Sequence, residues 1–114
     1  MNDIINKTEL LEEIDGDWEF LEESVEMLME DAPTLLAEIN KALSTKDAEA
    51  IWQNAHTLKS MVGNFSAKRA SAAAYRIETL GRNDDISEVI KLVPILESEI
   101  KQLISALNDF LINK

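Results

Sequence analysis

The stretch AEAIWQNAHTLKSMVGN, residues 48–64, predicts an amphipathic helix that ends at its glycine. Its apolar side chains recur at intervals of four, three and four residues, the spacing that places side chains on one face of an α-helix. The residues of this stripe are Ile51, Ala55, Leu58 and Val62. Because glycine followed by asparagine commonly ends a helix, we expect the helix to cover about residues 48–62. A helix with one apolar stripe needs other helices to cover that stripe.

The chain on both sides has the same helical spacing, with only three glycines and two prolines to interrupt it, so we predict an all-α fold. Before this helix we expect a short helix over about 8–14 and a long one from about 17 to 43, with a kink or restart at Pro33. After it we expect a fourth helix that begins at a Ser66 cap and ends at about 80. A last helix should run to about 110 with a bend at Pro94. The fourth is lined with alanines, which allow close helix contact. Short connections favour antiparallel neighbours, so the expected architecture is an antiparallel up-down four-helix bundle with a short additional N-terminal helix. At 114 residues, we expect a single domain over residues 1–114.

The composition excludes several classes of function. A net charge of −11 argues against a nucleic-acid partner, because such proteins need basic surface to displace counterions from phosphates. The apolar runs are far shorter than the 18 or more residues of a membrane span, and no secretory signal pattern opens the chain. Cysteine is absent, so disulfides and thiolate metal sites are unavailable. We therefore expect a cytoplasmic, monomeric protein that binds neither nucleic acid nor membrane.

The charge is unevenly distributed along the chain. Residues 1–55 carry a net charge of −12 and residues 84–114 a net charge of −3, whereas residues 56–83 carry +4. The cations of this middle segment are Lys59, Lys68, Arg69, Arg76 and Arg82. A local positive field on an acidic body suits a small anion or an acidic partner surface.

The face of residues 48–62 that the apolar stripe leaves free carries the candidate chemistry. Trp52, His56, Lys59, Ser60 and Gly63 share this face, because each residue turns a helix by about 100°. We expect His56, the one histidine of the chain, to be accessible to solvent. A neutral imidazole has a ring nitrogen with a free lone pair that can attack phosphorus, and Lys59 can offset phosphoryl charge. Ser60 and Gly63 are small enough to let a phosphorylated group approach in line.

Two residues of the fourth predicted helix are expected to flank this histidine. Glu78 and Arg82 lie on the face opposite the alanines and can approach His56 across the helix pair. The sequence places no carboxylate cluster around His56, so no metal site is expected there. Met27, Met29 and Met61 are interpreted as packing residues, not as a binding surface.

Residues 55–67, AHTLKSMVGNFSA, resemble the signature A-H-x-L-K-G-x-x-G-N-x-G-A of histidine-containing phosphotransfer (HPt) domains. This resemblance implies a phosphorelay carrier with His56 as phospho-acceptor, Lys59 as charge partner and Glu78 as a hydrogen-bonding neighbour. Arg82 is a further candidate. Ser60 and Ser66 stand where the family usually has glycine, which leaves the effect of Ser60 on transfer open.

The resemblance also implies the partners. The expected partners are receiver domains of response regulators or hybrid sensor kinases, with magnesium in the receiver and no cofactor of the chain's own. Trp52, Ser60, Gly63 and Phe65 are expected to supply contact area for the receiver. No kinase activity of its own is expected. The alternatives left open are a non-relaying adaptor bundle and a domain of a hybrid sensor or chemotaxis kinase.

Overall fold

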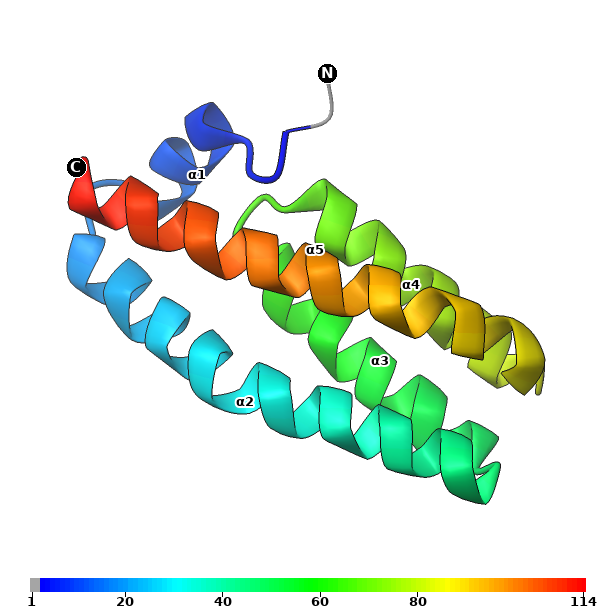
Figure 1. Ribbon diagram of the computed structural model, residues 1–114. Helices are drawn as coiled ribbons and strands as arrows, with labels where there is room; N and C mark the ends of the chain where they lie inside the picture. The colour runs from blue at the N-terminus through cyan, green and yellow to red at the C-terminus, as the bar shows by residue number, and fades with distance from the viewer. Residues whose placement is uncertain (1–2) are drawn as a thin grey trace.

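The computed structural model describes residues 3–114, which form five helices joined by short connections. They are α1 (Lys7–Ile14), α2 (Trp18–Thr45), α3 (Ala48–Gly63), α4 (Lys68–Arg82) and α5 (Ile86–Ile112). In Figure 1, α2 to α5 lie side by side, each antiparallel to the helix before it, and α1 lies at the end where α2 begins and α5 ends. The predicted all-α bundle with an additional short N-terminal helix is therefore confirmed.

Aspartate and asparagine side chains begin three of the helices. The side chains of Asn6, Asp17 and Asp47 each accept a hydrogen bond from the backbone amide three residues later, at the starts of α1, α2 and α3. These bonds satisfy amides that have no partner inside the helix. Between α1 and α2, Asp15 and Gly16 both have positive φ angles, +46° and +83°, and make the sharp turn that joins the two helices.

Each bundle helix contributes one stripe of buried side chains to a shared core. The α3 stripe predicted from the sequence is fully buried, and it packs against buried residues of α2, α4 and α5. The buried side chains of those three helices include Leu21, Val25, Leu28, Ile39, Ala70, Ala74, Ile77, Val93, Leu96, Leu103 and Leu107. Because this stripe faces inward, the opposite face of α3 lies toward solvent.

The two prolines do not divide their helices. Pro33 lies inside α2 and Pro94 inside α5, and both helices continue through them, so the expected restart at Pro33 is wrong. Both proline side chains are exposed. The carbonyl that loses its amide donor to proline therefore lies on the solvent side of each helix, where water can satisfy it.

Ser66 does not cap the fourth helix, contrary to the sequence prediction. The cap position of α4 is Ala67, which has no side chain to accept an amide hydrogen bond. Ser66 is buried with a φ of +53°, its hydroxyl donates to Glu13 at 3.4 Å, and its carbonyl accepts from the Asn6 amide at 2.9 Å. Its role is therefore to join the α3–α4 connection to α1 and the segment before it.

Helices α3 and α4 approach each other closely because α4 presents small residues to α3. Gly81 is buried, and a Cβ atom added there would lie 2.9 Å from the Cβ of Trp52 and 3.1 Å from its backbone nitrogen. Distances this short would force one helix to move. The α3–α4 pair therefore depends on Gly81, and the same pair carries the candidate site.

Candidate functional site

The buried stripe of α3 holds His56 at the surface. Its side chain is 50% exposed, and Ser60 and Gly63, one and two turns later, are exposed beside it. Lys59 is partly covered, on the side of α3 that faces α4. The exposed, small-residue face predicted from helical spacing is present in the structure.

Glu78 of α4 lies beneath these side chains as a buried carboxylate. Its side chain is 5% exposed, although the sequence placed it on the outer face of its helix. Its Oε2 lies 3.1 Å from His56 Nδ1 and accepts from Arg82 Nε and Nη2 at 3.1 and 3.0 Å. Its Oε1 pairs with Lys59 Nζ at 2.8 Å. Three side chains from two helices thus converge on one carboxylate.

These contacts determine the charge of Glu78. Burial, the largest single effect, would by itself raise the pKa of Glu78 because it disfavours the charged form. The hydrogen bonds from Lys59, Arg82 and His56 together outweigh burial and lower the pKa from 4.5 to about 2. Glu78 is therefore ionised at neutral pH and can only accept hydrogen bonds.

An ionised Glu78 selects the tautomer of His56. Since Oε2 carries no proton, the hydrogen between it and Nδ1 must belong to the imidazole. In a neutral ring, Nε2 then carries the lone pair. The half-exposed ring consequently offers Nε2 as a nucleophile to an incoming group, while Nδ1 is hydrogen-bonded to the buried Glu78.

Trp52 and Tyr75 border this cluster with aromatic rings. The Arg82 guanidinium lies 3.8 Å from the centroid of the Trp52 ring, and the Lys59 ammonium lies 5.1 Å from that of Tyr75. Both distances are within the range of cation–π attraction. Trp52, expected to be a docking residue, is half-buried and has one face of its indole occupied by Arg82.

Phe65 does not lie where the sequence analysis placed it. Its side chain is 2% exposed and belongs to the core. It follows the turn that ends α3, and the chain reverses there so that the ring points inward. The expectation that Phe65 supplies contact area for a partner is wrong.

A sequence-family comparison agrees with this geometry. The model of the family described as "Hpt domain" matches residues 23–109, a range that contains the histidine and every side chain bonded to Glu78. The chain belongs to the Hpt domain family.

The structure of this Hpt chain is similar to one solved by crystallography, that of histidine-containing phosphotransfer protein B (HptB) from Pseudomonas aeruginosa PAO1. The TM-score is 0.88 and the sequence identity 16%, and the alignment covers 100% of this chain and 99% of that chain. At this identity the similarity shows a common fold. A search of curated protein sequences returned no match.

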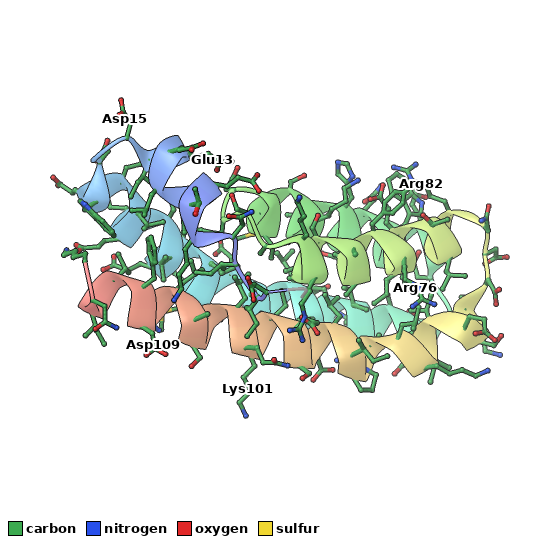
Figure 2. The ribbon with its side chains drawn as sticks, turned by 90° about the horizontal axis from the view of Figure 1, so that it is seen from above. Glu13, Asp15, Arg76, Arg82, Lys101 and Asp109 are labelled. Carbon is green, nitrogen blue, oxygen red and sulfur yellow. The ribbon has the colours of Figure 1, made fainter. Side chains whose placement is uncertain are left out.

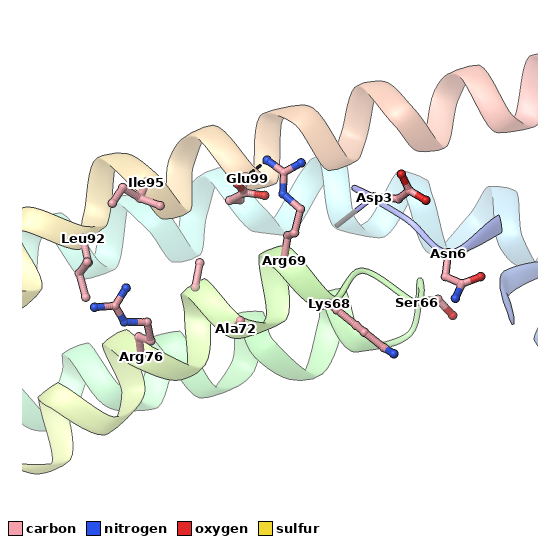
Figure 3. Close-up of a pocket in the computed structure, with 11 residues that line it drawn as sticks. Asp3, Asn6, Ser66, Lys68, Arg69, Ala72, Arg76, Leu92, Ile95 and Glu99 are labelled. Atoms are coloured by element: carbon pink, nitrogen blue, oxygen red, sulfur yellow. Dashed lines mark hydrogen bonds and ion pairs between the residues drawn. The ribbon is translucent and has the colours of Figure 1, made fainter. Parts of the chain in front are cut away.

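The positive charge of residues 56–83 is divided between two places in the Hpt chain. Lys59 and Arg82 bind Glu78, whereas Lys68, Arg69 and Arg76 line a groove of about 640 Å³ between α4 and α5 (Figure 3). Figure 2 shows Arg82 and Arg76 on opposite sides of α4. Only two of the five cations therefore act at His56, fewer than the sequence segment suggested.

The sequence analysis missed two exposed apolar side chains, Phe20 and Met27, that lie two turns apart on one face of α2. Phe20 and Met27 are each 61% exposed, so the interpretation of Met27 as a packing residue is wrong. Met29 is 46% exposed and its sulfur contacts Asn108 of α5, whereas Met61 packs against the core as expected. Phe20 also lines a groove of about 620 Å³ that reaches Gly63 and therefore adjoins the histidine-bearing helix. The available signal was two large apolar residues seven positions apart, outside the buried stripe of their helix.

Two further findings concern metals and membranes. Within residues 3–114, His, Cys, Asp and Glu side chains do not gather in groups of three or more that could hold a metal ion. Across the same residues, no helix of the Hpt chain combines the length and apolar character needed to span a bilayer.

Proposed function

We propose that the chain is a phosphocarrier of a two-component phosphorelay. In this proposal His56 accepts a phosphoryl group from the aspartyl phosphate of a receiver domain and passes it to the aspartate of another receiver. The observation that carries the proposal is the half-exposed imidazole whose Nδ1 is bonded to a buried, ionised carboxylate.

In the proposed transfer, every bond formed is matched by a bond broken, and no further reactant is needed. The Nε2 lone pair of His56 forms a bond to phosphorus as the acyl P–O bond breaks, and the receiver aspartate leaves as a carboxylate. The phosphorylated ring keeps its Nδ1 proton and gains positive charge, which the Glu78 carboxylate 3.1 Å away offsets. Transfer to the next receiver is the reverse of this step, so the carrier returns unchanged.

Lys59 is the cation best placed to act on the phosphoryl oxygens. Its ammonium binds Oε1 of Glu78, the oxygen that His56 does not use, and its side chain is 28% exposed. A lysine side chain is flexible, so Lys59 can turn toward a phosphoryl group on Nε2 while Arg82 keeps Glu78 neutralised. Ser60 and Gly63 leave the approach to the ring open.

Two exposed apolar side chains of α2 and the groove beside one of them support docking of a receiver. Phe20 and Met27 lie outside the core, and the groove at Phe20 continues to Gly63 on the histidine-bearing helix. Large apolar side chains are enriched in partner interfaces, so these two residues suit a docking surface near His56. We assign the magnesium of the reaction to the acidic pocket of the receiver.

Incubation with a phosphorylated receiver and magnesium tests the proposal. Label should move onto the chain, and His56→Gln should abolish this transfer and leave the helical circular dichroism unchanged. Labelling of the variant would show that another residue accepts the phosphoryl group. If the wild-type chain binds the receiver and takes no label from it, the chain is a non-relaying adaptor.

Lys59→Ala provides a second test. Loss of its charge should slow transfer by about 10- to 100-fold, which is less than the loss of a fully preorganised oxyanion donor because Lys59 also binds Glu78. Lys91→Ala, at an exposed ion pair on α5, serves as the matched control. Equal rates for the two variants would remove Lys59 from the mechanism.

A further inference from the structure

Two contacts hold the Arg82 side chain, the Glu78 carboxylate and an aromatic ring. It lies four residues after Glu78 on α4, and its side chain is 49% exposed. An exposed ion pair at this spacing is weak, because a long side chain loses conformational entropy when it is held in one position. The two hydrogen bonds from Arg82 to Oε2 therefore need an additional constraint if the guanidinium is to stay in place.

The indole of Trp52 provides that constraint. Trp52 precedes His56 by one turn of α3, and its ring lies against the Arg82 guanidinium with 3.8 Å from the guanidinium carbon to the ring centroid. The guanidinium thus has an indole face on one side and Oε2 of Glu78 at its edge. A planar cation that both stacks and donates two hydrogen bonds is restricted in both tilt and direction.

The backbone of α4 packs closely against the base of the Trp52 side chain. Gly81 lies directly against its Cβ and backbone nitrogen, so that α4 leaves no room for an added methyl group. This close approach fixes where the Trp52 side chain leaves α3, beside Arg82.

The oxygen bound by Arg82 is the oxygen that orients His56. Oε2 receives His56 Nδ1 and both Arg82 donors, whereas Lys59 uses Oε1. If Arg82 left, Oε2 would keep only the imidazole as a donor and the carboxylate could rotate toward Lys59. The His56 ring would then lose the fixed acceptor that selects its tautomer.

We propose that Trp52 is a positioning residue for phosphoryl transfer, which holds Arg82 on Glu78 so that the carboxylate keeps His56 in its reactive tautomer. Trp52 touches no reacting atom, and its effect passes through Arg82 and Glu78. This proposal rests on the proposed function of His56. It differs from the docking role that the sequence suggested for Trp52, because it predicts an effect with no receiver present.

The test uses the full chain and phosphoramidate, a small donor that phosphorylates histidine by transfer from nitrogen to nitrogen with release of ammonia. Trp52→Leu removes the aromatic face, and Trp52→Phe keeps one. Trp18→Leu, at a half-buried tryptophan of α2, is the matched control. The readouts are the rate of phosphohistidine formation and the ¹⁵N chemical shifts of the His56 ring nitrogens, which report the tautomer.

Trp52→Leu should slow phosphoramidate labelling by about fivefold or more and shift the His56 tautomer toward Nε2–H. Trp52→Phe should restore most of both, and Trp18→Leu should change neither. If Trp52→Leu is labelled by phosphoramidate at the wild-type rate and has wild-type ¹⁵N shifts, the proposal is overturned. If in addition only transfer from a receiver is slower, Trp52 acts in docking. The ¹⁵N shifts test the positioning role even if His56→Gln shows that His56 is not the acceptor.

Arg82→Lys keeps the proposal testable if Trp52→Leu does not fold. Lysine retains the charge and loses the planar fork, so it should give the same tautomer shift. A wild-type ¹⁵N spectrum in Arg82→Lys would also overturn the proposal.

Discussion

Replacing Glu78 with glutamine should remove a defined part of the acid sensitivity of the fold. The pKa of Glu78 is lowered from 4.5 to about 2 in the folded chain. A carboxyl group with a lowered folded-state pKa stabilises the fold above its unfolded pKa, and this stabilisation is lost as the pH falls through the folded pKa. The loss should therefore occur between about pH 4.5 and pH 2.

The size of this effect follows from the difference between the two pKa values. A shift of about 2.5 units corresponds to about 3 kcal/mol, since each unit is worth about 1.4 kcal/mol. Little correction for solvent screening is needed, because the Glu78 side chain is only 5% exposed. Urea denaturation followed by far-UV circular dichroism gives the free energy of unfolding of wild type and Glu78→Gln at each pH.

The comparison of the two proteins isolates Glu78 from the other acidic groups. The difference in free energy of unfolding between wild type and Glu78→Gln should shrink by about 3 kcal/mol as the pH falls from about 4.5 to about 2. Glu97→Gln, at an exposed position of α5, should show no such change relative to wild type. A wild-type advantage over Glu78→Gln that stays constant from neutral pH to pH 2 would refute the argument.

Five further substitutions test the packing and helix capping of the fold by the same denaturation measurement. Gly81→Ala should destabilise the fold by about 1–3 kcal/mol, because its Cβ would lie 2.9 Å from Trp52. Gly63→Ala, where an added Cβ meets nothing within 4 Å, should change stability by less than about 1 kcal/mol, and equal effects would contradict the close approach. Phe65→Ala should cost about 3–5 kcal/mol and Phe20→Ala under about 1 kcal/mol, and the reverse order would mean that the burial is misassigned. Asp47→Ala should cost about 1 kcal/mol through loss of the α3 cap, and an unchanged midpoint would show that water replaces it.

The sequence predicted the helices well because their signals are local. The predicted range 48–62 differs from α3 by one residue, since an aspartate cap begins the helix and an apolar stripe extends to its end. Ser66 was assigned wrongly because serine is a good cap in general, whereas the cap that forms depends on the path of the connection. That path places Ser66 at a positive φ and in contact with α1, which local sequence does not reveal.

The site was predictable as far as one helix could define it. The exposure of His56 and the position of Lys59 follow from helical spacing on α3 alone. The burial of Glu78 depends on the distance between α3 and α4, which Gly81 keeps short one turn after Glu78. Phe65 was expected at the surface because it is close to the motif in sequence, whereas the exposed Phe20 lies on another helix.

The negative charge of Glu78 affects both the stability of the fold and the chemistry proposed for His56. A buried carboxylate is costly unless several donors surround it, and here His56, Lys59 and Arg82 supply those donors. A glutamine could still accept the Nδ1 hydrogen bond, but it would carry no charge to offset a phosphorylated, positively charged imidazole. In the proposed transfer, the carboxylate would stabilise the ring most after His56 has accepted the phosphoryl group, when charge develops on the ring. Because its pKa lies near 2, the charge persists throughout the neutral range in which a phosphorelay works.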